Sequence, residues 1–493
     1  MNGARFTDYR RIAYTMGLTF MVVGWAYFFP LIMTLLERDT PLQSFLIPFV
    51  LTQSVGLLLY RLNSDKSALQ LNRIDSAVSV VFAWALTMAI STIPFLILTE
   101  LTFLQALFES VSGWTTTGLS MLDVSQYPNS LLLFRSLMQF LGGFGLIAIM
   151  MLSVIGVGTY SGLYQVEGHD AVLPSVKKTS RMLFSFYLGF TVVGIVAYVI
   201  VGMPLFDAIN HTMSAISTGG FSVQNDSIGH YQSLGIEIVT IVLMLLGGTN
   251  FALYILVLNG KFKAILKLND ARFFVVLLIV FIPFMMMLML TFSYAHLNDP
   301  IRVAIFEVVS ALSTTGYSIS DYSFYAAPII VLFIVIMLIG GQSGSTSGGI
   351  KMTRISLMLR NFWFSVRRVF DSERRVTDHV VYVPTGSKRI HKEDMINVYN
   401  FAFIYMLVLF FGTLILTLEG FTLQQSLFEF ASTIGTVGLS VGLLSSELSA
   451  LSYVTMIFGM FLGRLEFMIV FIVIFKIIKD AIQGIKGTVQ ARK

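Results

Sequence analysis

The sequence has no cysteine and few charged residues. Of its 493 residues only 12% are charged, whereas a soluble domain carries about 25%. The absence of cysteine excludes a disulfide framework, a thiolate metal site and thiol catalysis. The low charge, together with 56% hydrophobic residues and a mean hydropathy of +0.80, excludes a soluble globular protein.

Apolar runs long enough to cross a bilayer, which takes about 20 residues each, recur along the whole chain and leave no room for a separate soluble domain. The first run follows Arg5, Arg10 and Arg11, is 25 residues long and lacks a small-residue cleavage site. We therefore interpret it as a retained span and not as a signal peptide. The ten predicted spans are Ile12 to Leu36, Leu42 to Tyr60, Ser76 to Leu98, Leu131 to Ile155, Leu183 to Val201, Leu234 to Leu258, Phe273 to Phe292, Pro328 to Leu359, Val398 to Leu418 and Tyr453 to Ile478.

Basic residues concentrate in every second connecting segment, and acidic residues dominate the segments between them. The positive-inside rule places the basic segments in the cytoplasm. With ten spans, both termini are then cytoplasmic, and we expect a multi-pass membrane protein. The longest basic segment runs from Lys351 to Asp394. The other basic segments carry Arg61, Lys66 and Arg73, then Lys177, Lys178 and Arg181, then Lys261, Lys263, Lys267 and Arg272.

A short string ending in glycine, a bulky apolar residue and serine occurs four times. Each copy is preceded by a segment with the pattern of a short helix and is followed, 25 or 28 residues after its glycine, by a second glycine inside an apolar run. One such string is weak evidence, but four in register indicate an internal repeat. The strings are Thr115 to Ser120 (TTTGLS), Ser217 to Ser222 (STGGFS), Ser313 to Ser318 (STTGYS) and Gly435 to Ser440 (GTVGLS), and the second glycines are Gly143, Gly248, Gly341 and Gly463.

These repeats predict an all-α integral membrane protein of K⁺-channel-like architecture. A leading two-helix hairpin is followed by four units, each a span, a half-helix of roughly ten residues, a pore loop and a second span. The units are arranged with pseudo-fourfold symmetry around one ion pore. The expected boundaries are 1–70 for the hairpin, 71–180 for repeat 1, 181–270 for repeat 2, 271–395 for repeat 3 with a gating loop and a basic segment, and 396–493 for repeat 4 with the C-terminus.

The composition of the strings is that of a cation filter. Irregular backbone is tolerated at membrane depth only where protein or a wet cavity surrounds it, so the four loops are expected to meet around a shared space. Glycine lets carbonyl groups point inward, threonine and serine add hydroxyl oxygens, and together they replace the hydration shell of K⁺. The half-helices add the negative ends of their dipoles. The strings contain no acidic ring, which argues against a divalent-selective site. Small residues that merely pack between helices would explain one string and not four. The candidate K⁺ ligands are Thr116, Thr117, Gly118, Thr218, Gly219, Gly220, Thr314, Thr315, Gly316, Thr436, Val437 and Gly438.

With these features the sequence resembles the Trk/Ktr/HKT superfamily of K⁺ transporters, and specifically its bacterial TrkH-type subunits. The resemblance covers nearly the whole chain and rests on the four strings, the leading hairpin, the stretch from Gly340 to Lys351 (GGQSGSTSGGIK) and the pair Gly463 and Arg464. It implies uptake of K⁺ as the transported ion without a tightly bound cofactor. It further implies a multi-pass protein of the cell inner membrane, a homodimer in membrane lipid with one pore per subunit, and a cytoplasmic nucleotide-binding, TrkA-like regulatory ring.

The resemblance also implies that glycine in the first loop, here Gly118, marks K⁺-selective members, whereas some Na⁺-selective plant relatives carry serine. Two departures from the pattern are small. The second string has Gly219 where the first and third have threonine, and the fourth has Val437 at that place.

A gate is expected below the filter, in the second span of repeat 3. Its glycine-rich composition is incompatible with a regular helix in lipid, and Gly341 is level with the second glycines of the other repeats, which argues against an ordinary polar linker at the membrane face. The gate candidates in this segment are Gly340, Gly341, Gln342, Ser343, Gly344, Ser345, Thr346, Ser347, Gly348, Gly349 and Lys351. Lys351 and Arg354 are either linked to the gate or are anchors at the cytoplasmic face.

Arg464 is the second gate candidate. It takes the place of Phe144, Thr249 and Gln342 in the other repeats, and an arginine inside the membrane indicates function by default. The alternative is a buried structural ion pair. Glu466 is two residues away and does not face Arg464 on a helix, so a partner would come from another segment.

Five more polar positions flank the filter. Arg135 is expected to extend to the membrane interface. Glu109, Glu307 and Glu429 on the half-helices are expected to pair with nearby backbone donors and not to bind the ion directly, and His211 replaces the acid in repeat 2.

A gated K⁺ pore is the function that this pattern favours. A secondary transporter that couples K⁺ to H⁺ or Na⁺ is the alternative, but the four units run in the same direction and lack the inverted repeats common in transporters. An enzyme is not expected, because six scattered histidines and no cysteine supply no catalytic cluster. No nucleic-acid partner is expected. A Walker A string is absent, so nucleotide control would come from a partner docked on the basic segment between Arg360 and Lys392.

Overall fold

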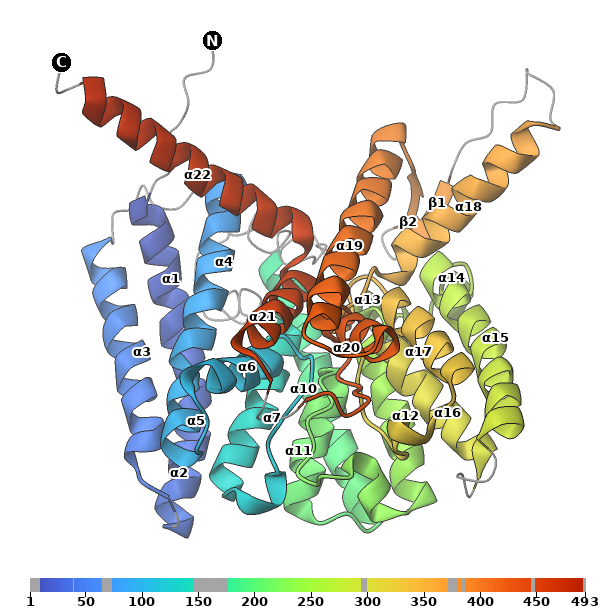
Figure 1. Cartoon of the computed structure of the whole chain (residues 1–493), viewed down its shortest axis with the longest axis horizontal. Helices are drawn as coiled ribbons and strands as arrows, with labels where there is room; N and C mark the ends of the chain where they lie inside the picture. Colours follow the sequence, from blue (N-terminus) through green and yellow to red (C-terminus); the bar gives the residue numbers. More distant parts are fainter. Residues whose placement is uncertain are drawn as a thin grey trace.

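The computed structural model describes residues 9–38, 40–63, 73–145, 176–293, 299–370, 380–383, 386–444 and 448–490. These residues form a bundle of helices with one short antiparallel hairpin, β1 (Val380–Val383) and β2 (Gly386–Arg389), in which Val381 pairs with Lys388. The all-α prediction is therefore confirmed apart from this hairpin, which lies within the long basic segment (Figure 1).

The leading hairpin consists of α1 (Tyr9–Val23), η1 (Gly24–Tyr27) and α2 (Phe28–Glu37), which form one span, and of α3 (Gln43–Leu62). Helices α1 and α3 are in close contact because both carry a glycine where they cross. A Cβ atom on Gly17 would lie 2.7 Å from the carbonyl oxygen of Gly56. Small residues of this kind allow membrane helices to approach closely, since the backbones then meet without side chains between them.

Each of the four repeats has the predicted order of span, half-helix, string and second span. The first spans are α4 (Arg73–Ile90) continued by α5 (Thr92–Leu98), α10 (Val176–Ile200), α15 (Asn269–Phe292) and α19 (Lys392–Leu418). The half-helices are α6 (Phe103–Trp114), α11 (Leu205–Ile216), α16 (Pro300–Ser313) and α20 (Leu423–Gly435).

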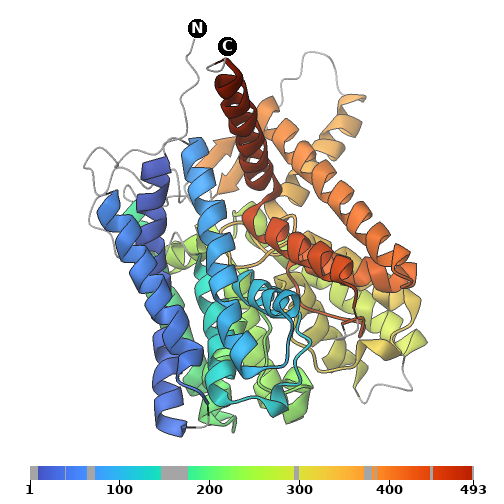
Figure 2. The same cartoon turned by 60° about the vertical axis from the view of Figure 1, so that its left-hand side comes forward.

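The second spans break near their middle. In repeat 2, α12 (Leu234–Gly248) and α13 (Phe251–Leu258) meet at 97°, and in repeat 4, α21 (Ala450–Leu465) and α22 (Phe467–Gln490) meet at 109°. Figure 2 shows α22, in dark red, turning away from α21. In repeat 3 the glycine-rich segment separates α17 (Ala327–Ile339) from α18 (Met352–Arg368). In repeat 1, α7 (Asn129–Phe144) is described, and residues 146–155 of the predicted span lie outside the described residues.

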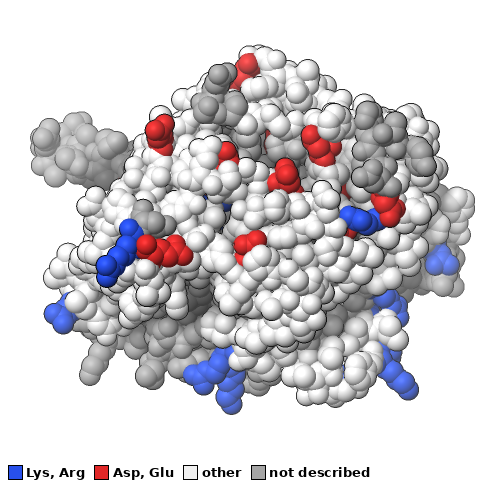
Figure 3. Space-filling view, turned by 90° about the horizontal axis from the view of Figure 1, so that it is seen from below, with Lys and Arg blue, Asp and Glu red and all other residues white. Residues whose placement is uncertain are grey.

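The described part of the chain contains six helices that are long and apolar enough to cross a membrane, or eight if each bent pair counts as one span. The two remaining predicted spans, in repeats 1 and 3, correspond to the shorter helices α7 and α17. The start of α1 and the end of α22 lie on the same side of the molecule, together with α18 and the hairpin (Figure 1). The opposite side carries acidic side chains over its central part (Figure 3).

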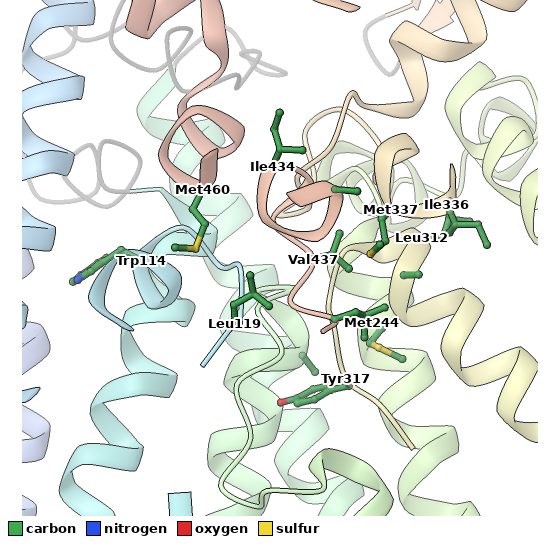
Figure 4. Packing of buried hydrophobic residues seen from close by; sticks show 14 of the residues in the cluster. Trp114, Leu119, Met244, Leu312, Tyr317, Ile336, Met337, Ile434, Val437 and Met460 are labelled. Carbon is green, nitrogen blue, oxygen red and sulfur yellow. The ribbon is translucent and has the colours of Figure 1, made fainter. Parts of the chain in front are cut away.

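The half-helices and strings lie at the centre of the bundle, inside a continuous apolar core. Trp114, Leu119, Tyr317 and Val437 are all buried there, each next to or within a string (Figure 4). Four short helices lie in the connections between the longer ones: η3 (Val124–Gln126), η4 (Ser227–Tyr231), η6 (Tyr322–Phe324) and α14 (Phe262–Ile265). The core holds the four irregular loops away from lipid, as their unpaired backbone groups require.

Candidate functional site

The four strings share one backbone conformation. In each, the threonine two residues before the glycine has a left-handed φ, and so does the glycine itself. The threonine values are 55° at Thr116, 53° at Thr218, 58° at Thr314 and 49° at Thr436. The glycine values are 88° at Gly118, 75° at Gly220, 78° at Gly316 and 95° at Gly438. Left-handed threonine is unfavourable by roughly 1–2 kcal/mol, so its recurrence indicates a loop held in one shape by its surroundings.

The four glycines face one another's strings in a closed ring. Each glycine lies against the carbonyl oxygen of the residue that precedes the glycine of the next string, and an added Cβ would overlap that oxygen. The distance from the added Cβ to the carbonyl oxygen would be 2.2 Å from Gly118 to Gly219, 2.0 Å from Gly220 to Thr315, 1.9 Å from Gly316 to Val437 and 2.3 Å from Gly438 to Thr117. The last contact returns to the first string, so the four strings surround one axis. Only glycine fits at these four places.

The acids on the half-helices pair with nearby backbone donors, as predicted, and these donors directly follow the serine that ends each string. Glu109 accepts hydrogen bonds from Ser120 Oγ (2.9 Å) and the amide of Met121 (2.8 Å). Glu307 accepts from Ser318 Oγ (3.0 Å) and the next amide, and Glu429 accepts from Ser440 Oγ and the amide of the residue after it. In repeat 2, Nε2 of His211 is 3.0 Å from Ser222 Oγ, so histidine takes the same position. These groups fix the turn that ends each string.

Arg135 does not extend to the membrane interface, and that prediction is wrong. The residue is 2% exposed, and its Nη2 donates to Ser120 Oγ at 2.7 Å and lies 3.6 Å from a carboxylate oxygen of Glu109. Its guanidinium also stacks 4.0 Å above the ring of Phe221. A cavity of about 190 Å³ opens here, lined by Arg135 and by the filter glycines of all four strings. A buried charge thus stands at the outer mouth of the ring, next to the acid that compensates it.

The glycine-rich loop lies directly against the inner ends of the strings, inside the protein as predicted. The amide of Gly348 donates to Thr314 Oγ1 (2.9 Å), and the hydroxyl oxygens of Thr346 and Thr218 are 3.1 Å apart. A Cβ on Gly348 would lie 2.0 Å from Thr436 Oγ1. The loop therefore touches strings 2, 3 and 4. Its polar members Gln342, Ser345, Thr346 and Ser347 are buried.

Arg464 connects this loop to repeat 1. Its guanidinium donates to the carbonyl oxygens of Thr346 (2.9 Å), Gly142 (2.5 Å) and Gly143 (3.0 Å). The two glycines belong to the last turn of α7, whose free carbonyl groups carry the negative end of the helix dipole. Glu466 pairs with Arg354 instead, at 2.8 Å. The carboxylate nearest to Arg464 in the sequence thus forms its ion pair with a different arginine.

The residues that end the loop are bound to its surroundings. Lys351 Nζ donates to the carbonyl oxygen of Ser347, and Thr353 Oγ1 donates to Ser343 Oγ at 2.7 Å. Arg354 stacks 3.8 Å from the ring of Phe401 as well as pairing with Glu466. A cavity of about 70 Å³ lies between the loop and Arg464. Lys351 and Arg354 are therefore in contact with the candidate gate, which settles their location and leaves their role as a prediction.

Sequence reasoning missed Gln139 on α7. Its Nε2 donates to the carbonyl oxygen of Gly219 (2.5 Å), and its Oε1 accepts from the amide of Phe221 (3.0 Å). A signal was present, because a glutamine interrupts an apolar span at the place where the other repeats have Met244, Met337 and Gly459.

Nothing in the described ranges has the chemistry of a resident metal centre, because no three His, Asp or Glu side chains there lie close enough together to hold a metal ion. The oxygens around the ring come from backbone carbonyls and threonine hydroxyls. Such neutral oxygen donors suit a monovalent cation that passes through, and not a tightly held divalent ion.

Comparison with known proteins gives consistent matches over almost the entire chain. The model of the TrkH family, described as cation transport protein, matches residues 41–483. The Trk system potassium uptake protein TrkG of Escherichia coli is 32% identical over 456 residues, which cover 89% of this chain and 92% of that protein. The protein TrkH of the same system in Halomonas elongata is 29% identical, over 93% of this chain and 96% of its own. The crystal structure of the potassium transporter TrkH from Vibrio parahaemolyticus superposes with a TM-score of 0.81 at 27% identity, covering 94% of this chain and 98% of that one.

Proposed function

The chain belongs to the TrkH family of cation transport proteins, an integral membrane transporter and not an enzyme, and we propose that it takes up K⁺ through the ring of four strings. The observation that carries the proposal is the closed set of glycine–carbonyl contacts from Gly118 to Gly438. Four loops with one backbone conformation around one axis supply a ring of carbonyl oxygens, and such a ring replaces the hydration shell of K⁺. The named potassium uptake relatives support K⁺ as the ion.

The ligands in this proposal are the residues from threonine to glycine in each string, with Gly118 as the determinant of K⁺ selectivity in the first. The segments 71–180, 181–270, 271–395 and 396–493 each contribute one loop, and 1–70 forms a peripheral hairpin. The left-handed threonines support this assignment, because they end the half-helices and turn the following backbone toward the common axis.

The glycine-rich loop and Arg464 form the gate in this proposal. Residues 340–349 lie against strings 2, 3 and 4 on the side where the bundle carries the chain ends, so a K⁺ ion leaving the ring meets them next. Arg464 holds the loop through the Thr346 carbonyl and repels the ion. At about 6 Å and an effective dielectric constant near 20 the repulsion is roughly 3 kcal/mol, or about a hundredfold in occupancy.

The regulatory partner is proposed to be a cytoplasmic nucleotide-binding ring on the side of α18 and the β1–β2 hairpin. This side carries the basic segment and, by the positive-inside rule, faces the cytoplasm, with both termini there. A movement of α18 caused by this partner would act directly on the loop, because α18 begins where the loop ends and Thr353 of α18 binds Ser343 of the loop. We also propose a homodimer in the bacterial inner membrane, with one pore in each subunit.

Flux measurements in proteoliposomes test the proposal. The purified protein is reconstituted and the voltage is clamped with a protonophore at equal pH on both sides. Tracer uptake of K⁺, Rb⁺ and Na⁺ is followed in separate experiments, and the K⁺ and Rb⁺ experiments have neither an H⁺ nor a Na⁺ gradient. A pore passes K⁺ and Rb⁺ down their own gradients under these conditions. Flux that occurs only when an H⁺ or Na⁺ gradient is restored would replace the pore with a coupled transporter.

A further inference from the structure

The second string differs from the others at one residue, and a side chain from another repeat occupies the space that this difference creates. Gly219 stands where the other strings have Thr117, Thr315 and Val437. A Cβ on Gly219 would lie 2.4 Å from Cδ, 2.5 Å from Oε1 and 2.9 Å from Cβ of Gln139. The glutamine of α7 therefore fills the volume of the missing side chain.

The amide of Gln139 also binds the backbone on both sides of Gly220. Its Nε2 donates to the carbonyl oxygen of Gly219 at 2.5 Å, and its Oε1 accepts from the amide of Phe221 at 3.0 Å. Gln139 is fully buried, so water does not compete for these bonds. The carbonyl group that it holds is the one that faces Gly118 in the ring.

This arrangement occurs once among the four repeats. Four residues before their second glycine, the other repeats have Met244, Met337 and Gly459. Met244 and Met337 are buried in the core around the loops (Figure 4). Helix α12, which carries Met244, packs against the half-helix that precedes Thr315, and α17, which carries Met337, packs against the one that precedes Val437. In those two repeats the second span thus has an apolar residue at this position, and the neighbouring string has a side chain. In repeat 1 the second span has an amide there, and the neighbouring string has glycine.

A second residue on the same face of α7 acts on the same string. Arg135 is four residues before Gln139, and therefore one turn away along the helix. Its Nη1 donates to the carbonyl oxygen of Ser222 at 3.4 Å, while its Nη2 binds Ser120 of the first string. Helix α7 thus contacts the second string at residues 219, 221 and 222 in succession. The spacing between strings 1 and 2 depends on this helix.

We propose that Gln139 is a positioning residue that sets ion selectivity, by fixing the Gly219 carbonyl of the second filter loop in place of the side chain that the loop lacks. Discrimination between K⁺ and Na⁺ in a carbonyl filter depends on the number, spacing and field strength of the carbonyl groups around the ion. A donor at 2.5 Å fixes one of the four carbonyls and draws on its lone pairs. The filter is thus asymmetric, and its second loop depends on Gln139. This inference rests on the proposed function.

The test is a double-mutant cycle read as the K⁺ to Na⁺ permeability ratio in voltage-clamped proteoliposomes. Gln139→Met removes both hydrogen bonds, and Gly219→Thr displaces the amide by collision. Each is expected to lower the ratio by about fivefold, the factor that corresponds to the one hydrogen bond that holds the Gly219 carbonyl of the ring. The double variant Gln139→Met with Gly219→Thr recreates the combination of Met244 with Thr315. It is expected to return to within about twofold of the wild type, because the two changes compensate each other.

Two further variants separate positioning from stability. Gln139→Glu keeps the volume and the acceptor but replaces the donor, and it is expected to lower the ratio even if Gln139→Met fails to fold. Ser136→Ala removes another buried hydrogen bond of α7, from Ser136 Oγ to the Leu132 carbonyl at 3.3 Å, without touching a string. This control is expected to leave the ratio unchanged.

The outcomes separate the positioning role of Gln139 from the proposed function of the protein. If the wild type is K⁺-selective but the single variants keep its ratio, or if the effects in the double variant merely add, the positioning role of Gln139 is overturned and the filter stands. Variants that lose protein yield and flux in proportion, at an unchanged ratio, would assign Gln139 a structural role only. A wild type that passes no K⁺ would overturn the proposed function itself.

Discussion

Gly438 of the fourth string lies against the carbonyl oxygen of Thr117 of the first, so close that an added Cβ would be 2.3 Å from that oxygen. These residues are more than 300 positions apart in the sequence. Their contact closes a ring that three similar contacts build from string to string. Binding of an ion within the ring requires this closure, because an open row of loops would not enclose an ion.

The ring is expected to reject any side chain at its glycines. Gly316→Ala would place a Cβ 1.9 Å from the Val437 carbonyl oxygen and force strings 3 and 4 apart. We expect a loss of K⁺ flux and of selectivity against Na⁺, measured in proteoliposomes. Gly442→Ala is the matched control, because Gly442 also has a left-handed φ, 84°, but meets nothing within 4 Å. Both variants carry the backbone penalty of roughly 1–2 kcal/mol, so equal effects would contradict the steric argument.

Removal of the Arg464 charge is expected to raise K⁺ flux. Arg464→Ala abolishes the repulsion of roughly 3 kcal/mol. It also removes the side chain that ties the loop, through the Thr346 carbonyl, to the Gly142 carbonyl of α7. We expect an increase of at least about tenfold in the initial rate of Rb⁺ uptake. Arg464→Lys keeps the charge but cannot span three carbonyl acceptors, so its rate should fall between the two. An unchanged or lower rate in a well-folded alanine variant would show that Arg464 is structural.

The protein is expected to lose stability when one partner of the buried pair Arg135 and Glu109 is removed. Arg135→Met leaves the Glu109 carboxylate buried without its counter-charge, 3.6 Å away in the wild type. Such a change costs about 3–5 kcal/mol, and we expect a clear drop in the apparent melting temperature in detergent. The double variant Glu109→Gln with Arg135→Met removes both charges and should recover a large part of the loss. A double variant less stable than either single one would contradict this view of the pair.

Asp123, in the loop that follows the first string, is expected to keep its negative charge at low pH. Asp123 accepts hydrogen bonds from Ser125, Asn225 and Gln126, which lower the pKa of its carboxyl group to about 2. Because the pKa is lower in the folded state than the ordinary 3.8, its contribution to stability is present above about pH 4 and is lost as the pH falls toward 2. The apparent melting temperature of the wild type should approach that of Asp123→Asn over this range. A difference between the two proteins that persists unchanged to pH 2 would contradict the assignment.

The sequence predicts the repeats well, because each string must satisfy the same local geometry. The positions of Gly118 and Gly316, the half-helices before them and the acids on those half-helices follow from the spacing alone. The glycine-rich loop was predicted inside the protein for a similar reason, since Gly341 is in register with the other second glycines.

Features that depend on another segment were not predictable in the same way. The burial of Arg135 follows from Ser120 and Glu109, which only the fold brings beside it. The break between Gly248 and Phe251 has a local signal, because Asn250 caps the helix that follows. The bend of 97° is not given by the sequence, since the backbone there binds Gln342 and Gly344 of the glycine-rich loop. Gln139 was overlooked because its partner is a backbone group of a different repeat.

The most direct test of the central claim is the K⁺ to Na⁺ permeability ratio of the wild type and of Gly118→Ser, measured in proteoliposomes under a clamped voltage. The serine Cβ would lie 2.2 Å from the Gly219 carbonyl oxygen and separate strings 1 and 2. The account predicts that the wild type passes K⁺ and Rb⁺ in preference to Na⁺ and that serine lowers this preference. A wild type without preference, or a serine variant with the full wild-type ratio, would show that the ring of strings is not the filter.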